Sequence, residues 1–206
     1  MPSTMTDADT RTRILDAAED LILRQGFAGT SLDAIVDRVD LTKGAFFHHF
    51  DSKDGLARAL IRRYEAMDRA HLEAQLGRAE RLSRDPLQQV LILVGLYAET
   101  MGRLAEPYPG CLFAAYCYQQ GIFDEEVNGV VRDGLRRWRQ VLGGKLREAM
   151  ERHEPRAPVE PEELADSFLA IVEGAFVLSK SLEEPGVVAD QLHRYRHYLE
   201  LLFGVE

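Results

Sequence analysis

The segment from Thr30 to Lys53 constrains the fold of this chain more than any other stretch, and it reads TSLDAIVDRVDLTKGAFFHHFDSK. Thr30 and Ser31 are both good N-cap residues for a short helix, and with Thr30 as the cap, Asp33 three residues later completes a capping box. Asp40 tolerates a left-handed turn conformation better than most residues do. A second short helix then runs from Lys43 to His49, with the preceding threonine as its cap. The pattern therefore predicts two short helices separated by a tight turn.

The second helix of this segment begins with two residues that carry almost no side chain, Gly44 and Ala45. Glycine costs about 1 kcal/mol in a helix interior, so its presence favours a helix whose first turn lies close to another molecule. Phe46 and Phe50 share a face at helical spacing, and we expect them to anchor the helix to the protein. A helix start with small side chains and hydrogen-bond donors suits the major groove of DNA.

The spacing of residues through this region resembles the DNA-binding segment of the TetR family of bacterial transcriptional regulators. The match covers about the first quarter of the chain, and its combined spacing is specific although each residue alone is a weak signal. Beyond it the resemblance is one of size and helical layout. The matching residues are Gly26, Phe27, Thr30, Ile35, Leu41, Thr42, Gly44, Phe47, His49, Phe50, Lys53 and Leu56.

The resemblance implies that these helices bind a double-stranded DNA operator, with hydroxyl groups, backbone N–H groups and lysine charge on the phosphates. Lys43 and His48 are expected to reach base edges, Ala45 to offer a methyl contact and Gly44 to permit close approach. Phe47 stands where the family usually has Tyr, so a phosphate contact through a phenol hydroxyl is absent. The expected DNA-binding residues are Thr30, Ser31, Thr42, Lys43, Gly44, Ala45, Phe47, His48, His49 and Lys53.

The charge of the chain is unusual for a protein that binds DNA. The formal net charge is −9, and residues 1–55 hold six Lys and Arg against ten Asp and Glu. DNA-binding modules are typically basic, although backbone N–H groups at helix starts bind phosphate without any net charge. We therefore expect weak nonspecific affinity for DNA and a strong dependence on the right base sequence.

Helical periodicity runs through nearly all of the 206 residues, and no stretch is typical of a β-strand. The pattern predicts an all-α fold of about nine helices, three in an N-terminal helix-turn-helix domain and six after it. The expected DNA-binding domain covers residues 1–53, which include the start of a fourth helix. Residues 54–206 are expected to form a helical ligand-binding and dimerisation domain.

The C-terminal part carries enough aromatic surface to line a small-molecule pocket, and the TetR resemblance implies such an effector. The candidate ligand-binding residues are Tyr97, Met101, Phe113, Tyr116, Phe123, Trp138 and Phe176. The last two helices are apolar over a broad arc, so one side can face the core and the other a second copy of the chain. The candidate dimer residues are Phe168, Ile171, Val172, Ala175, Leu192, Tyr195 and Leu199. Plain core packing is the alternative for both sets.

Other chemistry has weaker support in the sequence. Cys111 precedes a helix start, where the positive helix end lowers a thiol pKa, so a thiol- or electrophile-sensing regulator is one alternative and a buried apolar cysteine is the other. His193 and His197 have the spacing of a helical metal pair, but neighbouring arginines disfavour a cation, so we expect no metal and no cofactor. Phosphate-binding loops, catalytic serine motifs and zinc-spaced cysteines are absent, which argues against an enzyme.

The sequence has no run of 18 apolar residues and no apolar stretch typical of a signal peptide at its start, so we expect no membrane association and a cytoplasmic location. The best overall interpretation is a ligand-responsive repressor that binds a palindromic operator as a homodimer. The rival is a small-molecule-binding helical protein whose helix-turn-helix is structural only, and the acidic N-terminal module is its main support.

Overall fold

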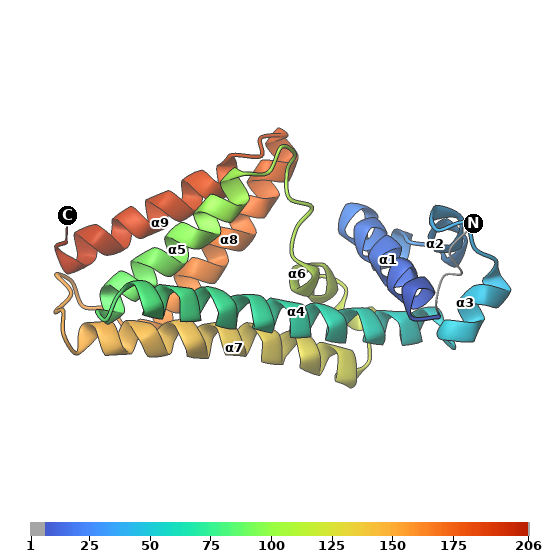
Figure 1. Cartoon of the computed structure of the whole chain (residues 1–206), viewed down its shortest axis with the longest axis horizontal. Helices are drawn as coiled ribbons and strands as arrows, with labels where there is room; N and C mark the ends of the chain where they lie inside the picture. Colours follow the sequence, from blue (N-terminus) through green and yellow to red (C-terminus); the bar gives the residue numbers. More distant parts are fainter. Residues whose placement is uncertain (1–6, 206) are drawn as a thin grey trace. The chain divides into compact units, whose positions relative to one another are not determined.

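The computed structural model describes residues 7–205, and every regular element in that part of the chain is helical, which confirms the predicted all-α fold (Figure 1). The elements in this range are nine α-helices and one 3-10 helix: α1 (Asp7–Gly29), α2 (Leu32–Arg38), α3 (Lys43–His49), α4 (Lys53–Leu82), α5 (Pro86–Gly102), α6 (Leu112–Cys117), η1 (Gln120–Ile122), α7 (Glu125–Met150), α8 (Pro161–Leu182) and α9 (Val187–Phe203). No helix among these residues is both long and apolar enough to span a lipid bilayer.

The helices group into two compact units. The first unit comprises the residues up to Met67 together with Cys111–Arg132, and the second comprises Asp68–Gly110 and the residues from Asp133 onward. Both α4 and α7 therefore have residues in each unit. The predicted division of the chain after residue 53 separates functions, whereas the compact units are defined by packing, so that division stays a prediction.

Short side chains cap both helices of the helix-turn-helix. Ser31 Oγ accepts a hydrogen bond from the N–H of Ala34, and Thr42 Oγ1 accepts one from the N–H of Ala45, the second as predicted. Of the two candidate caps of α2, Ser31 is the cap and Thr30 is not, because the Thr30 hydroxyl is buried and donates to the carbonyl of Gly26 instead. With Ser31 as the cap, Asp33 is the second residue of α2 and does not complete a capping box.

Asp40 makes the tight turn between α2 and α3. Its φ is +53°, the left-handed conformation that the sequence indicated for this position. The N–H of Asp40 donates to the carbonyl of Asp37, and the N–H of Leu41 donates to that of Val36 at 2.9 Å. The turn therefore closes back onto the end of α2, and it fixes where α3 begins.

The second unit has a continuous apolar core to which α5, α8 and α9 contribute, and α9 packs against both other helices (Figure 1). Asp85 caps α5: its Oδ1 accepts a hydrogen bond from the N–H of Gln88, and Pro86 occupies the first helical position. Tyr195 lies in the core, where its hydroxyl donates to the carbonyl of Leu164 at 2.8 Å. This hydrogen bond fixes the register of α9 against α8.

Most of the apolar stripe of α8 and α9 is packed inside one chain, which favours core packing, the alternative left open from the sequence, for most of the predicted dimer residues. Five of them have at most 2% of their surface exposed: Phe168, Ala175, Leu192, Tyr195 and Leu199. Ile171 and Val172 are half-buried against the same core. The sequence showed which positions are apolar but not which side of a broadly apolar helix faces inward. The exposed large apolar side chains of these helices are Val177, Leu178, Leu182, Tyr198 and Leu201.

Candidate nucleic-acid interface and ligand site

The short helix α3 has one face in the protein and one in solvent. Phe46 is fully buried, Phe50 just after the helix is 5% exposed, and their ring centroids lie 5.5 Å apart, so this pair anchors the helix as predicted. On the other side, residues three and four apart share a second face. This α3 outer face consists of the exposed residues Lys43, Gly44, Phe47 and His48.

Nothing inside the described structure requires glycine at position 44. A Cβ atom there would meet Thr42 Oγ1 at 3.7 Å, an ordinary van der Waals distance. Alanine is the better helix former by up to about 1 kcal/mol, so packing within the chain does not explain the choice. A bare helix start on an exposed face leaves room for the close approach of another molecule.

Many of the cations in the first unit already contact acidic side chains. Lys43 Nζ lies 2.7 Å from Asp33 Oδ1, and Asp20 pairs with both Arg24 and Arg38. Arg63 pairs with Asp16 and Glu19 in the same way. Carboxylates beside these cations weaken their attraction for phosphate, which agrees with the low nonspecific affinity expected from the sequence.

Three of the predicted DNA-binding residues contact the protein itself: Thr30 and the side chain of His49 are buried, and Lys53 is half-buried. Lys53 Nζ donates to the carbonyl of Phe27 at 2.6 Å and lies 4.1 Å from the centroid of that ring. Burial lowers the pKa of Lys53, and the neighbouring Asp54 partly opposes this. Thr30 has no exposed surface, and the side chain of His49 is 6% exposed. These residues shape the helix-turn-helix from inside.

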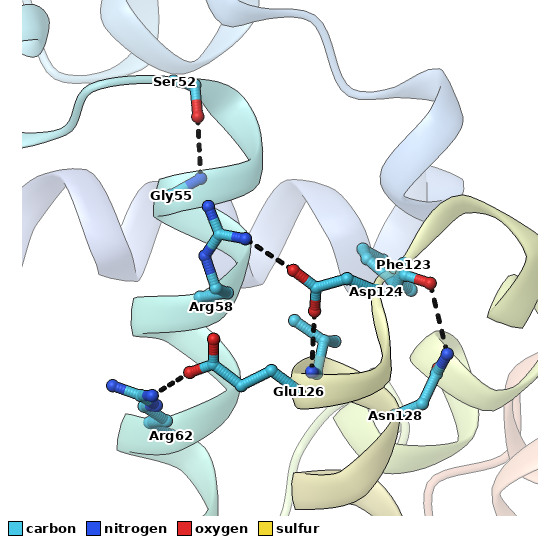
Figure 2. Close-up of polar contacts among 9 residues, drawn as sticks. Ser52, Gly55, Arg58, Arg62, Phe123, Asp124, Glu126 and Asn128 are labelled. Carbon is cyan, nitrogen blue, oxygen red and sulfur yellow. Dashed lines mark hydrogen bonds and ion pairs between the residues drawn. The ribbon is translucent and has the colours of Figure 1, made fainter.

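Residues 111–132 pack against α4 within the first unit, and Figure 2 shows the polar contacts at the start of α7. Arg58 donates to Asp124 at 2.6 Å, and Arg62 pairs with Glu126. Asp124 also accepts a hydrogen bond from the N–H of Val127, and this bond, followed by Arg58, holds the pKa of Asp124 below its usual value despite opposing desolvation. Sequence reasoning missed this connection because the partners lie 64 and 66 residues apart.

The candidate ligand residues are divided between the two units. In the first unit, Tyr116 stacks on Phe123 with ring centroids 4.4 Å apart, and Phe27 lies 4.8 Å from Phe123. The Tyr116 hydroxyl donates to the carbonyl of Ala57, and Phe113 is 2% exposed. These rings fill the interior of the unit, so core packing, the alternative left open from the sequence, accounts for Phe113, Tyr116 and Phe123.

In the second unit, Tyr97 is surrounded by other rings. Its ring centroid lies 5.4 Å from that of Trp138 and 5.2 Å from that of His71, and the Trp138 indole donates to Asp68 at 2.8 Å. The Tyr97 hydroxyl is buried without a hydrogen-bond partner in the described part of the chain. Burial, with Asp68 adding to it, raises the pKa of Tyr97, so the hydroxyl keeps its proton.

An unpaired buried hydroxyl costs about 1–3 kcal/mol, and a bound molecule with a hydrogen-bond acceptor would recover that cost at Tyr97. The two other candidates in this unit, Met101 and Phe176, are half-buried against its core. The Phe176 ring lies 5.1 Å from that of Tyr108. Of the predicted ligand residues, Tyr97 is therefore the one with a buried polar group that has no hydrogen-bond partner in the described part of the chain.

The cysteines and histidines singled out from the sequence lie on different elements. Cys111 is half-buried just before α6, and its proposed sensing role stays a prediction. His193 and His197 line a shallow depression on α9 together with Asp190 and Arg194. Among the residues the structure describes, no group of three or more His, Cys, Asp or Glu is placed to hold a metal ion.

Comparison with known proteins connects this geometry to a family. The family model for bacterial regulatory proteins of the tetR family matches residues 14–60, and the model for the tetracyclin repressor-like C-terminal domain matches residues 86–195. The chain belongs to the TetR family. This confirms the resemblance found in the helix-turn-helix and extends it over most of the chain. TetR-family proteins are transcriptional regulators and not enzymes.

Individual TetR-family relatives match along most of their length. The HTH-type transcriptional repressor NemR of Escherichia coli is 26% identical over 85% of this chain and 86% of its own. The transcriptional regulator AcuR of Cereibacter sphaeroides is 24% identical over 90% of this chain and 84% of its own. The crystal structure of a TetR-family regulator from Agrobacterium tumefaciens matches this chain with a TM-score of 0.77 at 22% identity. The match covers 94% of this chain and 98% of that chain. This chain is accordingly a DNA-binding transcriptional regulator.

Proposed function

We propose that this TetR-family protein is a repressor that binds a palindromic operator as a homodimer and releases it when a small molecule binds the second unit. The α3 outer face carries the proposal. It presents an ammonium group, a bare helix start, an aromatic ring and an imidazole on the side opposite the buried anchors Phe46 and Phe50. Two such helices would occupy major grooves about one helical turn (~34 Å) or a multiple of it apart.

Within this interface the exposed caps and the outer face have different roles. Ser31 and Thr42 are exposed at the starts of α2 and α3, where hydroxyl and backbone N–H groups bind phosphate. Lys43 and His48 reach base edges, and Gly44 allows the helix to come close. Thr30 and His49 support the surface from behind, and Lys53 fixes the start of α4 through its bond to the carbonyl of Phe27, so their substitution would alter DNA binding by disturbing the fold of the module.

For the homodimer, we propose the outer side of α8 and α9. Val177, Leu178 and Leu182 are between 46% and 58% exposed on α8, and Tyr198 and Leu201 are about as exposed on α9. A Cβ atom added at Gly174, on the same side of α8, would meet no atom within 4 Å. Exposed apolar residues on two helices that pack together favour a contact surface, and a two-fold dimer uses the same surface on both subunits.

For the effector, we propose a small molecule with an apolar body and a hydrogen-bond acceptor directed at the Tyr97 hydroxyl. The acceptor would pair the buried hydroxyl, and the rings of Trp138 and His71 would contact the apolar part. Both α4 and α7 have residues in each unit. A change that the effector causes in the second unit can therefore reach the first unit along these continuous helices. A coupling free energy of about 1–3 kcal/mol between effector and operator is sufficient.

The test is a selection of bound sequences from random duplex DNA, followed by transcription from a promoter that carries the selected site. A repressor of the proposed kind enriches a palindrome, binds it with two chains per duplex and lowers transcription. If no sequence is enriched, the helix-turn-helix is structural only and the rival interpretation stands. If a palindrome is enriched and transcription rises, the protein is an activator.

A further inference from the structure

We infer that Phe47 recognises the methyl group of a thymine in each half-site of the operator. This inference rests on the proposed function, because it needs the α3 outer face to lie in the major groove. It adds a specific base to that function and assigns the specificity to one side chain. The argument uses the position of the ring, its chemistry and the charges around it.

The Phe47 ring is exposed and held in one direction. It is 51% exposed, whereas the anchors Phe46 and Phe50 are buried. Its centroid lies 5.4 Å from that of Phe46 with the two ring planes at 90°, so the buried ring supports it at the edge. Phe47 follows Lys43 by one helical turn and therefore points to the same side of α3. A ligand that Lys43 reaches lies within reach of this ring.

The chemistry of the ring selects its partner. A phenylalanine has no hydroxyl and makes no hydrogen bond to phosphate, so at a DNA surface it is stabilised only by removing apolar groups from water. The C5-methyl group of thymine is the apolar group displayed on base edges in the major groove, and Phe is among the side chains that contact it. A ring at this position therefore favours thymine over the other three bases.

The acidic side chains around α3 weaken its attraction for DNA of any sequence, so the apolar contact of Phe47 supplies a large share of the preference for the operator. Lys43 is paired with Asp33 at 2.7 Å, and Asp7 lies within 3.6 Å of both His48 and His49. These carboxylates reduce the attraction of α3 for phosphate at any sequence. A contact whose strength depends on a base, and not on the backbone, is then what separates the operator from other DNA.

The test uses two pools of random duplex DNA, one prepared with thymine and one with uracil at every thymine position. Uracil pairs identically and lacks only the methyl group. Wild-type protein should enrich a palindrome with one fixed thymine per half-site from the first pool and should lose the preference for that position in the second. On the selected duplex, replacing that thymine by uracil should weaken binding about fourfold in one half-site and about fifteenfold in both.

Two variants assign the effect to the side chain. Phe47→Ala should bind the thymine and uracil duplexes equally, whereas Phe47→Tyr, which keeps the ring, should retain the thymine preference. Because Phe47 is half exposed, both variants should melt as the wild type does in circular dichroism. Equal wild-type affinity for the two duplexes, or an unchanged ratio in Phe47→Ala, overturns this inference while operator binding stands. If neither pool yields an enriched palindrome, the proposed function fails along with it.

Discussion

The Nζ atom of Lys43 lies 2.7 Å from Oδ1 of Asp33 and joins the first residue of α3 to the first turn of α2. The two side chains are 57% and 62% exposed, so the pair adds at most about 1 kcal/mol to stability. Its importance lies at the proposed interface. To contact a base edge, Lys43 must break its ion pair with Asp33 or share its ammonium group between the two. The charge of Asp33 also repels phosphate. The pair therefore acts against binding at sequences that offer Lys43 no partner.

The first prediction follows from this pair. Asp33→Asn should raise affinity for random-sequence duplex DNA and steepen the logarithmic dependence of binding on salt concentration by about one, because Lys43 becomes available to one more phosphate. Fluorescence anisotropy at several salt concentrations measures both quantities. Asp16→Asn is the control, since it makes the same charge change at an exposed ion pair of α1. An equal gain in the two variants would show that total charge matters and the Lys43–Asp33 pair does not.

Gly44 gives a prediction in which stability and DNA binding move in opposite directions. Gly44→Ala should keep or raise the free energy of unfolding, by up to about 1 kcal/mol, because alanine is the better helix former and the site has room for a Cβ. Operator affinity should nevertheless fall at least about tenfold, since the added methyl holds α3 away from the groove. Gly144→Ala in α7, where a Cβ also meets no atom within 4 Å, should leave operator affinity unchanged. Wild-type operator affinity in Gly44→Ala would remove Gly44 from the interface.

Local rules predicted the helix-turn-helix better than the rest of the molecule. The limits of α3, the Thr42 cap and the left-handed Asp40 all depend on a few neighbouring residues, and all match the structure. The hydrogen bond from half-buried Lys53 to the carbonyl of Phe27 depends on packing between segments 26 residues apart. The side of α8 and α9 that faces the core also depends on packing between distant segments. Periodicity shows that such residues are apolar or charged, but their partners are set by the tertiary fold.

The third prediction distinguishes the dimer surface from the core on the same two helices. Leu178→Glu should shift the protein from dimer to monomer in sedimentation velocity with little change in helical content, because Leu178 is 46% exposed in a single chain. Leu192→Ala should instead lower the free energy of unfolding by about 2–5 kcal/mol, since it removes buried side-chain volume from the core. A Leu178→Glu protein that remains dimeric at micromolar concentration would place the interface elsewhere.

The fourth prediction concerns the acid sensitivity of the second unit. Asp85 caps α5 and lies 2.6 Å from His153 Nε2. Burial acts to raise the pKa of Asp85, but hydrogen bonds from the N–H of Gln88 and from His153 outweigh it, so the pKa lies below 3.8. The folded protein therefore holds this proton less tightly than the unfolded chain does. The stabilisation from the Asp85 carboxylate is complete above about pH 5 and is lost as the pH falls through 3.8 and below.

Urea unfolding should show a larger free energy of unfolding for wild type than for Asp85→Asn at about pH 5, with a gap between the two values that narrows towards about pH 3. The reason is that Asn caps a helix about as well as Asp but carries no charge. His153→Ala should reduce the narrowing without abolishing it, since the Gln88 N–H remains. A gap that stays constant over this range would show that the Asp85 carboxylate titrates alike in the folded and unfolded protein.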